Sequence, residues 1–228
     1  MMTIRVNADL FNLAYGAVSK EETRYYLNGV FVEPHPERGA LLVSTDGHRM
    51  ICIHDETGDC TESAIVRLPR YALALCVPKR GKGLGLDRRV LEVDVKANSA
   101  TILDERVKKD GSIERSDPLI TAHRVIIEGT YPDWRKVTPK EPLEPAGLSG
   151  FNPKFMASLG AFGAALKPSH SATGMYFLKS AGVSEGSPIV VRFGGVHHVF
   201  AVLMPMRTDT TTTLPSFLTS KPVEAIAA

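Results

Sequence analysis

The sequence predicts an α+β fold in which helices lie on one face of antiparallel sheets. The first observation is a repeated order of events, because three segments each open with a short strand, continue into a helix start and end in several strands. The second is that the strand segments alternate apolar and polar residues and are rich in β-branched side chains. The pattern therefore indicates a β-α-β-β-β unit that occurs three times.

Each unit begins with a strand that leads directly into a helix. The paired stretches are 3–6 with 7–18, 63–67 with 68–77, and 147–151 with 152–166. Asn7 and Asn152 are suited to accept hydrogen bonds from free N–H groups as N-caps, and Pro69 and Pro153 are placed where a first-turn proline loses nothing. Apolar residues then recur at helical spacing, which predicts core-facing stripes formed by Leu10, Leu13 and Ala14 and by Phe155, Met156 and Leu159.

The strands behind each helix are predicted from their alternation. The first unit carries 25–33, 40–45 and 49–54, the second carries 90–95, 99–105 and 123–129, and the third carries 174–180, 187–193 and 197–204. Asp110 and Gly111 mark the tip of a hairpin in the second unit. The last residues of the chain lose the pattern and are expected to form a flexible tail.

Composition describes an ordinary globular chain with one basic region. The chain has 228 residues, 43% of them hydrophobic, and a formal net charge of +2 at pH 7. Any nucleic-acid footprint must therefore be local. Between residues 67 and 89 the only acid is Asp87, and the basic residues are Arg67, Arg70, Lys79, Arg80, Lys82, Arg88 and Arg89. A solvated surface is the alternative interpretation of this stretch.

Membrane and metal signals are weak. No stretch is as long as a membrane span, and the N-terminal residues lack the apolar core of a signal peptide, so we expect a cytosolic protein. Cys52, Cys60 and Cys76 form an odd set without paired spacing, which favours reduced thiols. Neither the cysteines with His54 nor the pair His197 and His198 shows the ligand spacing of a zinc finger, and we expect neither a metal nor another cofactor.

A compact polar cluster interrupts two apolar runs between residues 44 and 49. Asp46-Gly47 is a strong turn signal, so a purely structural turn is one interpretation. Catalysis by Ser44, Asp46 and His48 is a second, but the three are too close in sequence to converge on one reacting atom, and no nucleophile elbow accompanies them. A recognition surface is the third.

Four motifs in order resemble the bacterial DNA polymerase III β sliding clamp family. They are RYYLNGVFVE at 24–33, STDGHRMIC at 44–52, EGTYPDWRKVTP at 128–139 and FAVLMPMR at 200–207. Residues 1–140 resemble the middle domain of the family, built from two units, and residues 145–207 resemble the second half of its last domain, with 208–228 as a tail. The family chain has six units, and two chains close into a ring around duplex DNA. Because three units are recognised here, the resemblance implies the fold directly and a homo-oligomer only if a ring forms.

The resemblance implies a hydrophobic cleft beside the polar turn, which in the family captures a short peptide of Gln-Leu-x-Leu-Phe type. Apolar side chains would form its floor, and Arg49 and Arg207 would hydrogen-bond the peptide carbonyls. Lys136 departs from the arginine that is usual in the family. Met204 and Met206 taken alone would read as core residues. The matching positions are Leu27, Thr45, Gly47, His48, Arg49, Met50, Pro132, Lys136, Val137, Phe155, Val202, Met204, Pro205, Met206 and Arg207.

The resemblance also implies a DNA-contacting surface. Arg24, Tyr25 and Tyr26 match positions with which the clamp touches DNA, and the basic stretch overlaps the second helix, in a family whose helices line the DNA channel. A channel rich in Lys and Arg holds phosphates without reading bases, as sliding requires. The residues predicted to contact DNA are Arg24, Tyr25, Tyr26, Arg70, Lys79, Arg80 and Lys82.

The sequence therefore predicts a non-enzymatic processivity factor that encircles or holds duplex DNA and binds DNA polymerase and clamp loader subunits through short linear peptides. The alternative is an adaptor or decoy that keeps the cleft without encircling DNA. An enzyme is a third possibility, which no motif supports. In the tail, Leu214 and Phe217 in TLPSFL have the spacing of the first Leu and the Phe of the clamp-binding peptide, although the Gln and the second Leu are missing.

Overall fold

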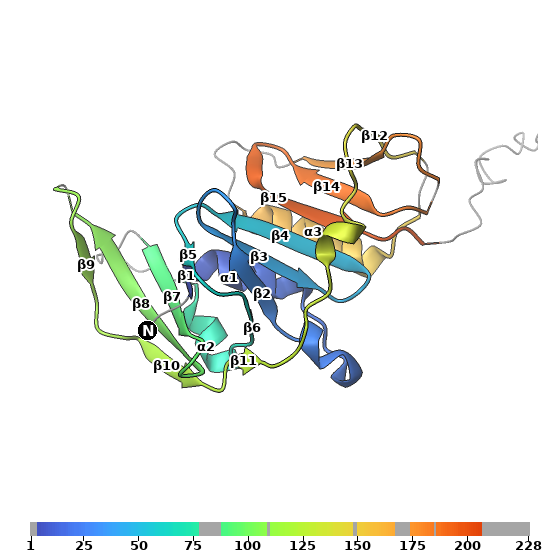
Figure 1. The fold of residues 1–228 in the computed structure, drawn as a ribbon. Helices are drawn as coiled ribbons and strands as arrows, with labels where there is room; N and C mark the ends of the chain where they lie inside the picture. The colour runs from blue at the N-terminus through green and yellow to red at the C-terminus, as the bar shows by residue number, and fades with distance from the viewer. Residues whose placement is uncertain are drawn as a thin grey trace, which may run out of the picture.

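Two antiparallel sheets and three α-helices make up the described part of the chain. The computed structural model describes residues 4–77, 88–108, 110–147, 150–166, 174–184 and 186–206. Figure 1 shows the smaller sheet at one end of the molecule and the larger sheet running through the rest of it. The predicted α+β class is confirmed.

The larger sheet has nine strands in the order β11-β6-β2-β3-β4-β15-β14-β13-β12. The strands of the first two units are β2 (Val30–Pro34), β3 (Ala40–Thr45), β4 (Arg49–Asp55), β6 (Ala64–Val66) and β11 (Ile126–Ile127). The strands of the third unit are β12 (Leu143–Pro145), β13 (Met175–Ser180), β14 (Ile189–Phe193) and β15 (Val196–Leu203). The polar cluster at 44–49 therefore lies at the β3–β4 connection, near the middle of this sheet.

The smaller sheet has six strands in the order β10-β8-β7-β1-β5, with β9 paired to β8. Its strands are β1 (Ile4–Asn7), β5 (Asp59–Cys60), β7 (Arg88–Asp94), β8 (Ser99–Val107), β9 (Ile113–Arg115) and β10 (Ile120–His123). The predicted hairpin tip is present between β8 and β9, where Gly111 has a φ of +82°.

The helices begin where the sequence predicts them. They are α1 (Ala8–Ala14), α2 (Arg70–Leu75) and α3 (Pro153–Ala165). Asn7 Oδ1 accepts hydrogen bonds from the N–H groups of Asp9 and Leu10, and Asn152 Oδ1 accepts one from the N–H of Lys154. In Figure 1, α1 and α3 lie on the same side of the nine-stranded sheet.

The first two units exchange their first strands. β1 of the first unit pairs with β7 of the second, and β6 of the second unit pairs with β2 of the first. Each sheet therefore contains strands from both units, and the two units share one core that includes Phe11, Val32, Leu91 and Ile102. Neither unit buries its apolar face without the other.

The third unit joins the first through the pairing of β15 with β4, in which Val202 lies opposite Met50 and Phe200 opposite Cys52. The core cluster continues across this junction to Leu159 and Val199. Residues 1–140 and 145–207 thus share one sheet and one core, and their division into two domains stays a prediction.

Three local predictions differ from the structure. The predicted strand 123–129 is divided between β10, which ends at His123 in the smaller sheet, and β11 (Ile126–Ile127) in the larger sheet, because the chain turns at Arg124, whose φ is +58°. Residues Glu22–Leu27 form a 3₁₀ helix, η2, and β2 begins only at Val30, because Asn28 and Gly29 end the turn before the sheet begins. In the predicted strand 147–151, residues 148 and 149 lie outside the described part, and Gly150 makes a single bridge to Met206.

Candidate functional site: an apolar cleft at the junction of the first and third units

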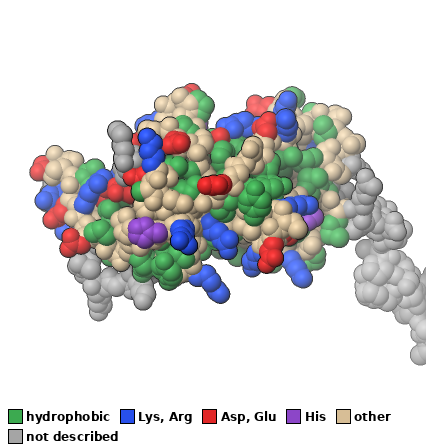
Figure 2. Space-filling model, turned by 60° about the horizontal axis from the view of Figure 1, so that its bottom comes forward, with side chains coloured by type: hydrophobic (Ala, Val, Ile, Leu, Met, Phe, Trp, Pro, Cys, Tyr) green, Lys and Arg blue, Asp and Glu red, His purple; other side chains and the backbone are tan. Residues whose placement is uncertain are grey.

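An apolar hollow of about 170 Å³ opens where the β3–β4 turn, the end of β15 and the 3₁₀ helix η3 (Trp134–Val137) meet. Most of the residues predicted for the cleft line it, namely Leu27, Thr45, Gly47, His48, Arg49, Met50, Pro132, Val137, Val202 and Met204. Figure 2 shows hydrophobic side chains gathered on this face, with Lys and Arg side chains around them. Tertiary structure therefore brings together residues that are up to 177 positions apart in the sequence.

The floor of the cleft is a second hydrophobic cluster on the face of the nine-stranded sheet opposite to the main core. Leu27, Met50 and Val202 belong to this cluster together with Tyr131 and Trp134. The cluster exists because residues facing one way along β3 and β4 reach the main core and the alternate residues face this side. The cleft is thus an incompletely covered part of a packed apolar layer.

The segment 128–138 crosses this sheet face and forms one wall. The ring of Tyr131 stacks on Phe31 with centroids 4.7 Å apart, and burial raises the pKa of the Tyr131 hydroxyl. Trp134 Nε1 donates a hydrogen bond to Glu33 Oε1 at 3.2 Å, and the Arg135 guanidinium lies 4.3 Å from the Trp134 ring centroid. These contacts hold the wall rigidly against β2.

Tyr131, Asp133 and Trp134 also line the hollow, and the sequence analysis did not assign them to it. The signal that could have found them is their position, because they flank Pro132 within the same motif. Trp134 is buried at the edge of the hollow because of tertiary packing, and the motif alone does not specify that packing.

The β3–β4 turn forms the opposite rim. Asp46 Oδ1 accepts hydrogen bonds at 3.0 Å from the N–H groups of His48 and Arg49, and Gly47 has a φ of +88°, which favours glycine. An added Cβ at Gly47 would lie 2.7 Å from a guanidinium nitrogen of Arg24, so Arg24 lies directly over the turn. The structural turn and the cleft rim are the same feature.

The catalytic interpretation of this turn is not supported by the geometry. Ser44 is fully buried, and its hydroxyl donates a hydrogen bond to the carbonyl of Ala14 at the end of α1. His48 instead lies at the surface and stacks on Phe155. Ser44 is therefore part of the buried interior and His48 is part of the surface, so the two side chains do not act on a common group.

Arg49 is held by partners within the chain. Its Nε donates to Asp46 Oδ2 at 3.0 Å, one terminal nitrogen donates to the carbonyl of Gly16 at 3.1 Å, and the other contacts Ser158 Oγ on α3. The guanidinium carbon also lies 5.4 Å from the Phe155 ring centroid. Arg49 therefore ties the turn to α3 and to the 3₁₀ helix η1 (Tyr15–Ala17) that follows α1. The expected donation to peptide carbonyls would use only the N–H groups that remain.

Of the other five predicted cleft residues, the four that the structure describes do not line the hollow. Phe155 supports His48 from α3, while Lys136 faces a neighbouring hollow of about 410 Å³ that shares Val137 with the cleft. Met206 is 46% exposed and follows Pro205 at the end of the described chain. Arg207 lies outside the described residues.

The predicted DNA residues are only partly described. Arg24 and Tyr25 are exposed, Tyr26 packs against the second hydrophobic cluster, and Arg70 is exposed in the first turn of α2. Lys79, Arg80 and Lys82 lie outside the described residues. The side chains predicted to contact DNA on the first unit therefore border the cleft, because Arg24 covers Gly47.

Two arginines of the basic stretch are engaged within the smaller sheet. Arg88 hydrogen-bonds to Glu105 Oε2 through Nε at 3.1 Å, and Arg89 binds both carboxylate oxygens of Asp104. These residues bind acids of the same sheet and contribute little free positive charge. Among the charged side chains of the three helices are Asp9, Arg70 and Lys154.

Cysteine and metal chemistry do not contribute a site in the described ranges. Cys52, Cys60 and Cys76 are free and buried, and burial raises the pKa of their thiols to about 12, about 11 and about 12. Within residues 4–206, the described stretches contain no group of three His, Cys, Asp or Glu side chains able to hold a metal ion. In the same stretches, every helix is too short to cross a membrane.

Comparison with known proteins gives one consistent result. No family model matches the chain. A curated relative, the beta sliding clamp of Caulobacter vibrioides, is 28% identical over 131 residues, which cover 55% of this chain and 30% of that protein. The chain thus matches less than a third of the length of its curated relatives.

Solved structures extend the likeness over most of the chain. A sliding clamp from Bartonella birtlesii, solved bound to griselimycin, covers 91% of this chain and 67% of its own, with a TM-score of 0.59 and 17% identity. The Thermotoga maritima polymerase III β subunit has a TM-score of 0.59, 14% identity and coverages of 92% and 66%. A Helicobacter pylori clamp bound to a DNA ligase peptide has a TM-score of 0.54, 15% identity and coverages of 91% and 66%. This chain is similar in sequence to bacterial β sliding clamps, is shorter than they are, and has their fold.

Proposed function

We propose that this protein binds short peptide segments of partner proteins in the apolar cleft and acts as a clamp-type processivity factor that holds duplex DNA. The observation that carries the proposal is the cleft itself, in which an apolar floor of Leu27, Met50 and Val202 lies open beside a polar rim. Sites of this kind take one or two apolar side chains of an extended peptide and orient its backbone through the rim.

The likeness to a clamp solved with a DNA ligase peptide supports a peptide as the occupant. The resemblance of the four sequence motifs suggests DNA polymerase and clamp loader subunits that carry Gln-Leu-x-Leu-Phe segments as the proposed partners. The proposed role is non-catalytic, since in the described residues Asp46 binds Arg49 and the hydroxyl of Ser44 is buried against the carbonyl of Ala14, away from His48.

Holding duplex DNA is the second part of the proposal and requires several copies of the chain, since three units are too few to surround a duplex. The support is the fold together with exposed Arg24, Tyr25 and Arg70. The predicted basic residues Lys79, Arg80 and Lys82, which follow α2 in the sequence, would add phosphate contacts.

A peptide-binding adaptor that does not encircle DNA is the alternative. It is favoured by the sparse charge of the described helices, whose basic residues include only Arg70 in α2 and Lys154 in α3. A surface that held a duplex by its phosphates would need several such side chains, because each phosphate contact contributes a part of the affinity.

Two measurements separate these functions. A fluorescently labelled Gln-Leu-x-Leu-Phe peptide should bind in fluorescence polarisation, and a peptide in which Leu and Phe are replaced by Ser should not. Equal binding of both peptides would refute the cleft. Retention on nicked circular DNA and release after linearisation would indicate a ring, whereas peptide binding without any retention would identify the adaptor.

A further inference from the structure

The first and second units cover each other, but no further unit covers the third in this way within the described part of the chain. In the described part of the chain, units one and two bury each other through exchanged strands and a shared core. The third unit joins the first side by side, through the pairing of β4 with β15 and the contacts of the β3–β4 turn with α3, without an exchange of strands. In the first two units, the covered face is the one that each unit turns toward the other. We locate the same face on the third unit by aligning α3 with α1 at their N-cap residues.

Asn7 and Asn152 cap α1 and α3 in the same way, which sets the two helices in register. In that register Phe11 corresponds to Met156. Phe11 has no exposed surface and lies in the core that the first two units share, whereas Met156 is only partly buried. The same position is thus sealed in the first unit and left partly open in the third.

The strands show the same difference. Val30 and Val32 on β2 are fully buried, but Met175 and Phe177 on the corresponding strand β13 are only partly buried. Phe177 stacks on Phe151, with ring centroids 5.6 Å apart, at the edge of the core. Partly open apolar and aromatic side chains on neighbouring elements are typical of a face that another protein surface covers.

The pairing of β13 also differs from that of the corresponding strand β2. β6 pairs with the first three residues of β2, Val30 to Val32, whereas β12 pairs with the last three residues of β13, Leu178 to Ser180. The N–H of Ala146, directly after β12, also donates a hydrogen bond to the carbonyl of Phe177, so that among the described residues only Met175 and Tyr176 pair along the sheet with β14 alone. The place that an exchanged first strand occupies in the first two units is therefore only partly filled in the described part of the third.

Helix α3 is apolar on its outer face as well. Ala157, Ala161 and Ala164 are exposed with Gly160 between them, and Lys154 is its only charged residue. A helix at the surface of a soluble protein normally carries charged residues on that side, and one that is apolar all round is normally covered. Small side chains allow a second helix to approach closely.

The first two units show how such a helix is covered. Ala72 of α2 and Cys76 at its end are buried in the same core cluster as Phe11 and Ala14 of α1, so the two units bury their helices together. In the register of the N-caps, Phe11 and Ala14 correspond to Met156 and Leu159 of α3.

We propose that the third unit packs against the third unit of a second copy of this chain, with the two α3 helices antiparallel about a two-fold axis. An isologous contact needs only one self-complementary surface, and the first two units show that two β-α-β-β-β units form a domain in this way. DNA is a poor occupant, since only Lys154 would meet its phosphates. The dimer holds six units arranged as three two-unit domains.

The test is the mass in solution by light scattering at about 100 µM, a concentration at which a specific interface is populated. The parent protein should have twice the 24.8 kDa of one chain. Ala157→Arg, which keeps a good helix former at an exposed site, should halve that mass and leave the circular dichroism spectrum unchanged. Ile113→Arg, at a 51% exposed residue of the smaller sheet, is the matched control and should remain dimeric.

A parent protein with the mass of one chain would overturn the proposal, whether the face is left open or covered by the chain's own tail or by another protein. A parent dimer that Ala157→Arg does not dissociate would overturn the assignment of the face. Because peptide affinity of the cleft is measured separately, failure of the dimer leaves the proposed function standing.

Discussion

The imidazole ring of His48 stacks on the ring of Phe155, with centroids 5.6 Å apart and planes inclined by 21°. This contact joins the β3–β4 turn of the first unit to helix α3 of the third. The backbone reinforces it, since the N–H of Met204 donates a hydrogen bond to the carbonyl of His48 at 2.9 Å. The cleft is therefore a property of the junction and is lost if the third unit separates from the first.

Removing an apolar side chain from the cleft floor should weaken peptide binding. Leu27→Ala and Met204→Ala should each cost about 2 kcal/mol or more, a loss of about thirtyfold in affinity, if these side chains anchor the peptide. The measurement is titration with the labelled peptide after thermal melts confirm folding. Tyr176→Ala, at a 59% exposed residue on β13, is the control and should bind like the parent. Unchanged affinity in both cleft variants would contradict the assignment.

Arg49 should stabilise the junction between the turn and α3. Lysine has one terminal nitrogen, so Arg49→Lys would lose the hydrogen bond to either Gly16 or Ser158, and it would also lose the packing of the planar guanidinium against the Phe155 ring. The free energy of unfolding should therefore fall by about 1–2 kcal/mol. Because Arg49 and Ser158 contact each other, Arg49→Lys and Ser158→Ala should not be additive in urea denaturation. Additive effects would mean that the contact contributes nothing to stability.

DNA binding should be independent of sequence and sensitive to salt. Each phosphate contacted on duplex DNA adds about 0.9 to the slope of log affinity against log salt, so Glu replacing Lys79, Arg80 and Lys82 together should flatten that slope. Lys136→Glu, at an 80% exposed side chain near the cleft, is the control and should keep the slope of the parent. If the triple variant binds linear and circular duplex like the parent, this stretch is not the DNA face.

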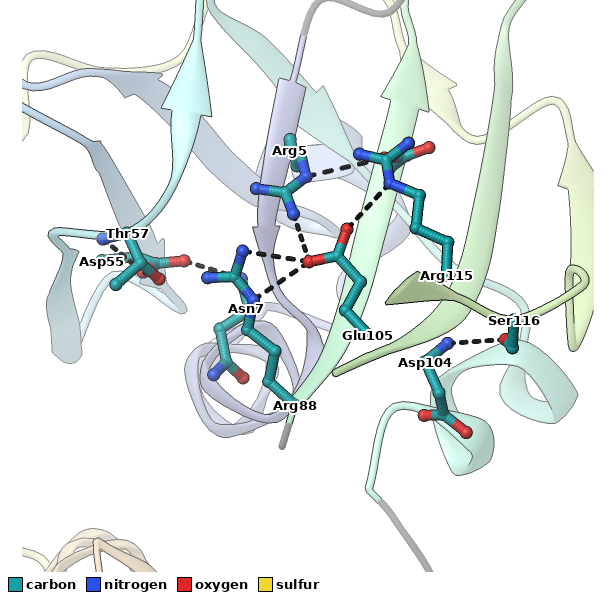
Figure 3. A network of polar contacts seen from close by, with 10 residues as sticks. Arg5, Asn7, Asp55, Thr57, Arg88, Asp104, Glu105, Arg115 and Ser116 are labelled. Atoms are coloured by element: carbon teal, nitrogen blue, oxygen red, sulfur yellow. Dashed lines mark hydrogen bonds and ion pairs between the residues drawn. The ribbon is translucent and has the colours of Figure 1, made fainter. Parts of the chain in front are cut away.

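The buried carboxylate of Glu105 should make the smaller sheet sensitive to acid. Figure 3 shows Glu105 surrounded by Arg5, Arg88 and Arg115. Burial alone would raise the pKa of Glu105, but hydrogen bonds and charge from Arg5 and Arg88 outweigh it and lower that pKa below 4.5.

Since the pKa of Glu105 is lower in the folded protein, its stabilisation is complete above pH 4.5 and is lost as the pH falls through the folded-state pKa. Glu105→Gln should therefore lower the free energy of unfolding by about 3 kcal/mol at pH 7 and by less in acid. Glu114→Gln, at an exposed ion pair with Lys108, should change it little at any pH. A deficit of Glu105→Gln that does not shrink in acid would show that lost packing, and not charge, causes it.

The tail should compete weakly with partner peptides. Leu214 and Phe217 lie outside the described residues, which end at Met206, two positions after a cleft residue. A short tether gives an effective concentration in the millimolar range, so even a poor motif competes. Deletion after Arg207 and Phe217→Ala should tighten binding of an added peptide, while Val223→Ala should not. Identical affinities in all four proteins would leave the tail without a regulatory role.

The helices, strands and turns of this protein follow from local interactions that can be recognised in its sequence. The caps Asn7 and Asn152, the turn at Asp46-Gly47 and the alternation along β3 and β4 act over a few residues, so they could be predicted without a structure. The cleft residues were predicted through motifs rather than through propensity, and the hollow lined by Leu27, Met50 and Val202 lies where those motifs meet.

Tertiary structure alone decided which elements meet. The pairing of β4 with β15, the exchange of β1 and β6 between units, the place of Trp134 in the cleft wall and the contact of Arg49 with Ser158 all join residues distant in the sequence. Such contacts depend on the burial of whole apolar faces, which local propensity does not encode. For the same reason the sequence showed three units but not that the third leaves an apolar face open, since exposure is a property of the assembled fold.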